Sequence, residues 1–165
     1  MHLARALFAK GLDQQAVNLV RRSWAQLPID STVSGPFLAS YAQYLQPEDH
    51  VARLDRLLWE GQAEAAERMM SLVGPEHRAL ATARIKLRRQ DGGVDAAIER
   101  VPESLIRDAG LVYERARWRR QAGDDVGAAD MLDPPPSVVA RPDLMWRELE
   151  HAARRALQRG DISVA

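Results

Sequence analysis

The side chains with the clearest potential for chemistry are arginines that recur at fixed distances before glycines. Arginine stands eight residues before three glycines, and again one helical turn later in two of these segments; the set is Arg53, Arg84, Arg88, Arg115 and Arg119. If the segments repeat in space, their guanidinium groups form a ladder along one face. The ladder either forms salt bridges with Asp and Glu of neighbouring segments, or it binds carboxylate ligands, which a guanidinium fork matches in shape and charge. Because 21 of the 23 basic residues are Arg, salt bridging is the simpler interpretation.

Motifs for catalysis or metal binding do not accompany these arginines. The chain has no Cys, which excludes thiolate nucleophiles and zinc–thiolate sites. Glu148 and His151 have the ExxH spacing of di-iron bundles, but such a site needs a second ExxH pair and two further Glu. We therefore expect Glu148 and His151 to be surface charges, and we expect no metal, no cofactor and no catalytic residue.

Charge and hydropathy limit the partners. Basic and acidic residues are both 23, so the chain has no overall field to attract nucleic acid. No apolar stretch approaches the roughly 18 residues that a membrane helix needs, and no apolar segment near Met1 resembles a signal peptide. The length of 165 residues fits one domain, which we place at residues 1–165.

Glycine and alanine recur together along the chain. Three glycines are 31 residues apart, two more flank them, and Ala follows each by five residues; the pairs are Gly11–Ala16, Gly61–Ala66, Gly92–Ala97, Gly123–Ala128 and Gly160–Ala165. Ala is only 26 of the 165 residues, so five matches from five indicate a repeat. One Gly in each unit of about 30 to 40 residues is typical of solenoids built from helix pairs.

The repeat predicts antiparallel helix pairs. Each Gly is expected to end a first helix, because glycine adopts the left-handed cap without a Cβ penalty. The Ala then lies where the second helix crosses the first, because a small side chain lets two backbones approach closely. We therefore predict an all-α solenoid of about five units, with an additional helix within residues 37–45 and an uncertain third register at Gly92–Gly93.

The Gly-x4-Ala unit is similar to a tetratricopeptide repeat, although the aromatic expected four residues before the Gly is replaced in every unit. A resemblance to the helical superhelix (U-type) domain of bacterial soluble lytic murein transglycosylases covers almost the whole chain. It is carried by FLASYAQYLQPEDHVARLDRLLWEGQAEAAERM at 37–69, LVYERARWRRQAGDDVGAADML at 111–132 and RPDLMWRELEHAARRALQRGDISVA at 141–165.

This resemblance implies a periplasmic protein whose curved helical stack supports a separate lysozyme-like domain. In the family that second domain cleaves the MurNAc–GlcNAc bond of peptidoglycan with one Glu, in an E-S motif that precedes a G-A-x-G-L-M-Q string. Here ESLIRDA at 103–109 reproduces only the opening of the motif, so we expect Glu103 to start a helix. The family's catalytic domain is absent, and we expect this chain alone to be inactive and to belong to a longer protein.

Two functions therefore stay open. The first is a non-catalytic scaffold of a lytic transglycosylase, whose arginine ladder guides the lactyl and stem-peptide carboxylates of glycan strands. The second is a free-standing tetratricopeptide-like adaptor that binds a protein or peptide in its concave groove. A parent gene with a downstream G-A-x-G-L-M-Q segment would distinguish the first from the second.

Overall fold

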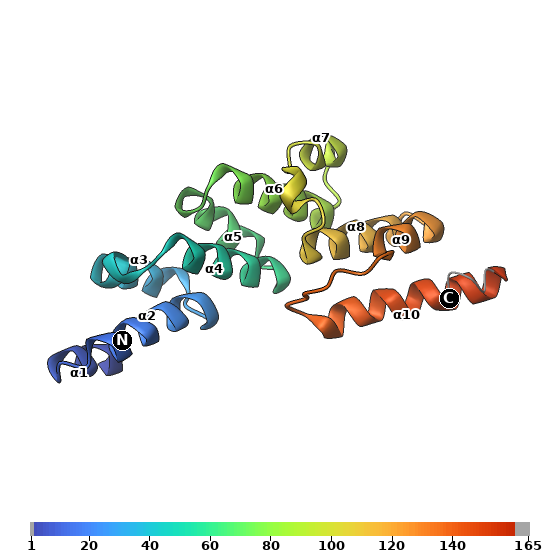
Figure 1. Ribbon diagram of the computed structural model, residues 1–165. Helices are drawn as coiled ribbons and strands as arrows, with labels where there is room; N and C mark the ends of the chain where they lie inside the picture. Colours follow the sequence, from blue (N-terminus) through green and yellow to red (C-terminus); the bar gives the residue numbers. More distant parts are fainter. Residues whose placement is uncertain (1, 161–165) are drawn as a thin grey trace. The chain divides into compact units, whose positions relative to one another are not determined.

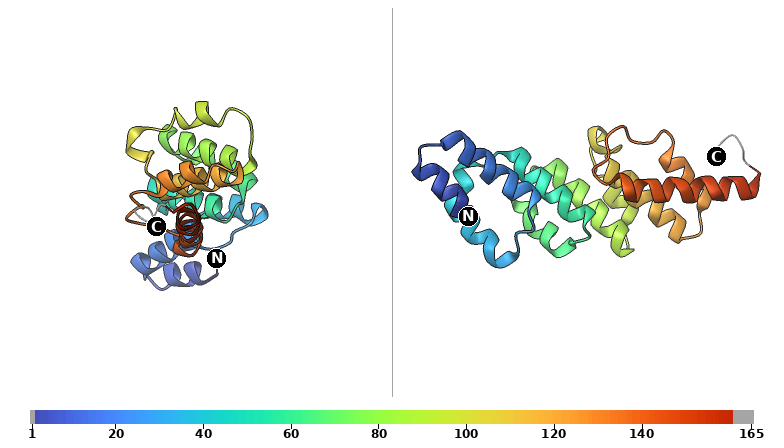
Figure 2. Two further views of the ribbon diagram at one scale, coloured as in Figure 1. Left: turned by 90° about the vertical axis from the view of Figure 1, so that its right-hand side faces the viewer. Right: turned by 90° about the horizontal axis from the view of Figure 1, so that it is seen from below.

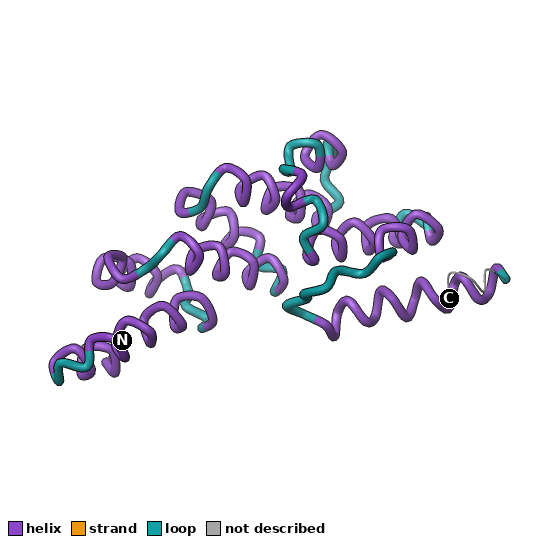
Figure 3. The backbone as a smooth tube through the Cα atoms, in the orientation of Figure 1, coloured by secondary structure: helices purple, strands orange, loops and turns teal. Residues whose placement is uncertain are grey.

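The chain is all-helical. A computed structural model describes residues 2–160, and within them there are helices, turns and loops but no strand (Figures 1 and 3). This confirms the predicted fold class, an all-α helical-repeat fold. The chain divides into two compact units at the junction of Gly74 and Pro75, and each unit is described by itself.

The first unit contains two helix pairs and an additional helix between them. Helices α1 (His2–Ala9) and α2 (Asp13–Gln26) form the first pair, and α4 (Pro47–Trp59) and α5 (Ala63–Met69) form the second. The predicted additional helix is α3 (Ser31–Tyr41), extended by the short 3₁₀ helix η1 (Ala42–Tyr44). A further 3₁₀ helix, η2 (Met70–Leu72), follows α5.

Aromatic rings build the core of the first unit. The ring of Trp24 stacks on Phe37 at 5.3 Å between centroids, and Phe37 in turn contacts Tyr41 at 5.2 Å. All three side chains are buried. Because Phe37 and Tyr41 are one turn apart on α3, this packing fixes the additional helix against α2.

The second unit continues the repeat. Helices α6 (Pro75–Arg89) and α7 (Val94–Ile98) form one pair, followed by the 3₁₀ helix η3 (Glu103–Leu105). Helices α8 (Ala109–Gln121) and α9 (Asp125–Leu132) form the next, and α10 (Pro142–Arg159) packs against both of them (Figures 1 and 2). Apolar side chains from α6, α7 and α8 form a common core, which includes Leu87, Val94 and Leu111.

Glycines end the first helix of each pair, as the repeat predicts, with one exception. The backbone is left-handed at Gly11, Gly61, Gly123 and Gly160, each directly after such a helix. At Gly160 the backbone N–H donates to the carbonyls of Ala156 and Leu157, which closes the last turn of α10. These bonds use carbonyls that a helix end would otherwise leave without partners.

The third turn differs from the prediction. Helix α6 ends at Arg89 and the left-handed residue after it is Gln90, with φ 58°, whereas Gly92 is not left-handed. Gly93, with φ 73°, then precedes α7. This turn therefore contains two left-handed residues, Gln90 and Gly93, where each of the other turns contains one, and it is longer than the others. Gly93 suits its left-handed position because it has no Cβ.

The alanines at the predicted crossings are buried. Their relative exposures are 0% for Ala16, 0% for Ala66, 3% for Ala97 and 5% for Ala128. Ala165, the fifth of the series, lies outside the described residues. The four observed values confirm that these alanines are buried, as the predicted crossings require, and in a close-packed interior a larger side chain would have to displace its neighbours.

No helix within residues 2–160 is long and apolar enough to cross a membrane.

A larger side chain at a crossing should destabilise the fold. We expect Ala97→Leu to lower the free energy of unfolding by about 1–3 kcal/mol, because three more carbons must enter a filled core. The matched control is Ala96→Leu, since Ala96 is exposed on the same helix and its replacement should stay within about 0.5 kcal/mol of wild type. Urea unfolding measures both. Equal effects of the two variants would contradict the crossing role of Ala97.

Candidate functional site

Arg53 lies buried at the carboxyl end of α2. Its Nη1 donates to the Trp24 carbonyl at 3.0 Å and its Nη2 to the Ile29 carbonyl at 2.6 Å, while Cζ stands 4.4 Å from the centroid of the Trp24 ring. One turn along α4, Arg56 donates to the carbonyls of Ala25 and Leu27, both at 3.1 Å. The end of α2 and the loop after it therefore bind two cations, which suits the negative end of a helix dipole.

Arg84 lies buried on α6 against the start of α8. Its Nη1 is 3.6 Å from Oδ1 of Asp108, the residue that caps α8 by accepting from the Leu111 amide at 2.9 Å. A Cβ at position 110 would overlap the guanidinium group, so Gly110 is needed for this close approach. The cation of Arg84 is therefore packed between two helices.

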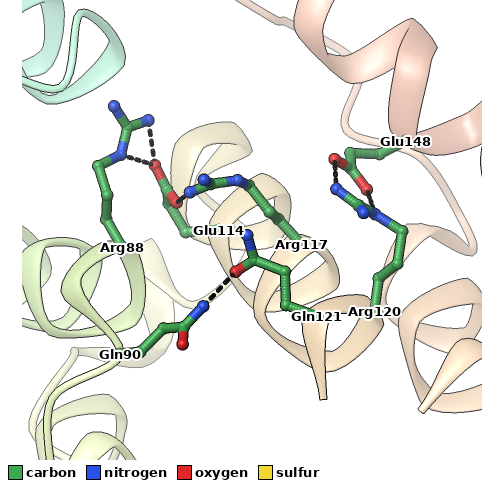
Figure 4. Close-up of polar contacts among 7 residues, drawn as sticks. All are labelled: Arg88, Gln90, Glu114, Arg117, Arg120, Gln121 and Glu148. Carbon is green, nitrogen blue, oxygen red and sulfur yellow. Dashed lines mark hydrogen bonds and ion pairs between the residues drawn. The ribbon is translucent and has the colours of Figure 1, made fainter. Parts of the chain in front are cut away.

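Arg88 pairs with Glu114, which is buried on α8. Both Nε and Nη2 of Arg88 donate to Oε1 of Glu114, the Nε bond being 2.7 Å long (Figure 4). Oε2 of the same carboxylate lies 3.6 Å from Nη1 of Arg117. Glu114 thus stands between two guanidinium groups, one from α6 and one from its own helix.

A second buried carboxylate joins α8 to α10. Arg120 donates to Glu148 through Nε at 2.8 Å and through Nη2 at 2.9 Å, a two-point pair that Figure 4 also shows. The expectation that Glu148 is a surface charge was wrong, because only 7% of the residue is exposed. His151 instead contacts Asp125, with Nε2 3.4 Å from Oδ1. The ExxH spacing therefore serves two separate ion pairs.

Arg115 and Arg119 lie one turn apart on α8 and are half-buried. Arg119 is 3.4 Å from Asp124 Oδ2, whereas Arg115 makes no hydrogen bond or ion pair with any described residue. The pKa of Arg115 is lowered, first by burial and then by the like charges of Arg119 and Arg107. These three arginines form a cationic cluster in the second unit, with Asp95 as the opposing charge.

The arginines of the predicted ladder thus lie in different environments. Arg53 belongs to the first unit and contacts carbonyls, and Arg84 and Arg88 face carboxylates of α8 or its cap. Arg115 and Arg119, one turn apart on α8, lie in a cluster of like charges with Arg107, and Arg53 has Arg56 as a like-charged neighbour. Ligand binding by these five residues stays a prediction.

Glu103 lies exposed at the start of η3, after Pro102, as the expected helix start would have it. In the part of the chain that the structure describes, no three His, Asp or Glu side chains are placed to hold a metal ion.

The first unit contains a pocket beside Arg53. Its volume is about 280 Å³. It is lined by Trp24, Ile29, Asp30, Ser31, Ser34, Leu38, Arg53, Gln62, Ala65, Arg68, Met69 and Leu72. Arg68 was not among the predicted site residues. Arg68 lies on α5, seven residues after Gly61. The sequence alone does not reveal it as a pocket residue, because the pocket is lined by side chains from α3, α4 and α5 together.

The second unit contains an apolar groove between α9 and α10. Its volume is about 540 Å³, and Leu132, Leu149, Ala153 and the exposed side chains of Trp146 and Leu157 line it. Trp24 and Trp59 are buried and Trp118 is partly buried, whereas Trp146 is 67% exposed.

Comparison of the chain with protein-family models, curated proteins and solved structures finds no match in any of the three.

Breaking the Arg88 pair should destabilise the second unit. We expect Arg88→Ala to cost about 3 kcal/mol, because the buried Glu114 carboxylate would retain only Arg117, at 3.6 Å. Arg147→Ala, an exposed residue of α10, should change stability by less than about 0.5 kcal/mol. Urea unfolding of both variants tests this, and a cost for Arg88→Ala no larger than for Arg147→Ala would contradict the role of the pair.

His50 should make the first unit sensitive to acid. Its Nδ1 accepts a 3.1 Å hydrogen bond from Trp24 Nε1, which requires the neutral ring, and burial lowers the pKa of His50 from its ordinary value of 6.5 while Asp49 opposes the shift. A histidine whose folded pKa is depressed stabilises the fold fully above the unfolded pKa, and this stability is lost as the pH falls below it.

We therefore expect the unfolding free energy to fall between pH 7 and pH 5, and to fall less in His50→Gln. The control His77→Gln, in the second unit, should retain the wild-type slope. The same slope in wild type and His50→Gln would contradict the assignment.

Proposed function

We propose that the chain is a non-catalytic helical scaffold of a periplasmic soluble lytic murein transglycosylase, and that it guides peptidoglycan strands during their cleavage. The observation that carries this proposal is the resemblance to the superhelix domain of that family in residues 37–69, 111–132 and 141–165. The all-helical repeat fold is compatible with it. In this proposal the chemistry belongs to a lysozyme-like domain, and the helical chain contributes binding.

The cationic cluster of Arg107, Arg115 and Arg119 is the surface that best suits a guiding role. Arg107 donates from Nη1 to the Met131 carbonyl at 3.4 Å and from Nη2 to the Pro134 carbonyl, so two of the three charges have protein partners. Arg115 has none among the described residues, and its neighbours repel it. An added carboxylate would relieve this repulsion, as the lactyl and peptide carboxylates of murein can do.

A second candidate function is a tetratricopeptide-like adaptor for another protein. It is favoured by the apolar groove between α9 and α10, where Trp146 and Leu157 are 67% and 57% exposed. Large exposed apolar side chains that line one groove are typical of protein-binding surfaces. Peptide capture that depends on Trp146, without any binding to murein, would support this function.

Binding to murein sacculi tests the first proposal. We expect wild type to co-sediment with sacculi, and we expect retention to fall with salt, because the Debye length shrinks from about 10 Å at 0.1 M to about 3 Å at 1 M. Arg115→Ala/Arg119→Ala should bind more weakly at low salt. Arg5→Ala/Arg22→Ala removes the same charge from exposed positions of the first unit and is the control. Equal retention of all three proteins would contradict a guiding role of the cluster.

A further inference from the structure

The pocket in the first unit is built around a buried cation that no carboxylate neutralises. Arg53 is only 3% exposed, and its guanidinium group donates to the carbonyls of Trp24 and Ile29. Its Nε is buried without a hydrogen-bond partner in the described part of the chain. Glu60, a carboxylate that acts on Arg53 electrostatically, already accepts a 2.7 Å bond from Arg56. A buried charge in this state favours the entry of an anion nearby.

A second guanidinium lines the same pocket. Arg68 is exposed on α5 and makes no hydrogen bond or ion pair with the described residues. The pocket is therefore lined by Arg53, which holds only carbonyls, and by Arg68, which holds nothing. Arg68 retains all five of its donors for a ligand.

The one acid in the pocket, Asp30, is already used by the protein. Its Oδ1 accepts from the Thr32 and Val33 amides at 2.8 and 3.1 Å and from the Thr32 hydroxyl at 2.6 Å. The Thr32 hydroxyl and these amide bonds lower the pKa of Asp30, because they favour its charged form. Asp30 thus completes the amino end of α3, and the lining retains one net positive charge from its two arginines.

The remaining lining selects for size and shape. Leu38, Met69 and Leu72 give the pocket apolar walls, and the hydroxyls of Ser31 and Ser34 add polar contacts at the start of α3. A volume of about 280 Å³ is at the lower limit of ligand pockets. It admits an acidic group with one or two small apolar substituents, but not a sugar chain or a helix.

We propose that this pocket binds the terminal carboxylate of a short acyl or peptidyl chain with small apolar side chains, and that Arg68 and Arg53 supply the positive charge. The chemical class of this ligand follows from the residues that line the pocket. Its biological source rests on the proposed function, because murein offers such groups both in stem peptides that end in alanine and in the lactyl group of muramic acid.

Titration with small acids tests the proposal directly. The probes are N-acetyl-alanyl-alanine, its carboxyl-terminal amide and N-acetylmuramic acid, followed in ¹H–¹⁵N spectra of the full chain through the Trp24 indole N–H and the Ser31 and Ser34 amides. We expect at least one acid to bind, and we expect the peptide amide to bind at least tenfold more weakly than the peptide acid. Preference for one acid identifies the source of the carboxylate.

Variants separate binding in the pocket from nonspecific attraction to surface arginines. Arg68→Gln should weaken acid binding at least tenfold without loss of stability, because Arg68 has no contact to lose. Arg22→Gln removes an equally exposed charge of the same unit and should leave binding unchanged. Arg53→Lys retains the charge with less of the fork geometry, and its melting temperature reports separately on the structural role of Arg53.

Equal binding of the peptide acid and its amide, binding unaffected by Arg68→Gln, or no binding of either acid would overturn the proposal. Acid binding by a chain that does not co-sediment with sacculi would preserve the carboxylate pocket and reject the murein function. Co-sedimentation without acid binding would reject the pocket and preserve that function.

Discussion

The structure depends on the close approach of two helices at an alanine. At Ala16 and Ala66 no surface is accessible at all, and Ala97 and Ala128 are nearly as buried. A methyl group at each crossing lets the paired backbones come together, and a glycine or Gln90 reverses the chain just before it. The pairs then pack on one another within each unit, α4 against α2 in the first unit and α8 against α6 in the second. The contacts made by arginine follow from this spacing.

Arginine side chains then connect neighbouring helices. In the first unit, Arg53 and Arg56 bind carbonyls of α2 and of the loop that follows it, and in the second unit Arg88 and Arg120 bind carboxylates on the next helix that packs beside theirs. Most of the arginine ladder is therefore part of the packing. The two proposed ligand sites lie where the protein does not complete the pairing: beside Arg53 and Arg68 in the first unit, and around Arg115 in the second. In our proposal the scaffold binds through charges that its own fold leaves incompletely neutralised.

Sequence patterns predicted the fold well because a helical repeat depends on the spacing of glycine and alanine along the chain. Four of the five turn glycines and four buried alanines follow from one Gly-x4-Ala period and the rules of helix ends, and the longer step from Gly11 to Gly61 indicated an additional helix, which begins at Ser31, before the predicted range of 37–45. Patterns failed where a tertiary contact decides. Glu148 was assigned to the surface, although Met145, Glu148 and Ala156 share the buried face of α10. Glu114 was overlooked, although Leu111, Glu114 and Trp118 follow the spacing of an apolar stripe. The pocket was beyond prediction, because Asp30, Arg53 and Arg68 meet only after α3, α4 and α5 have packed.

The central functional claim is that incompletely paired arginines on a helical scaffold bind carboxylates of murein. Soluble muropeptides with free carboxylates, compared with the same muropeptides after amidation, measure this most directly in ¹H–¹⁵N spectra of the full chain. The account predicts shifts at Trp24, Ser34 and Arg115 with the free acids, and their loss after amidation. Shifts that survive amidation, or that are confined to Trp146 and Leu157 in the apolar groove, would contradict it.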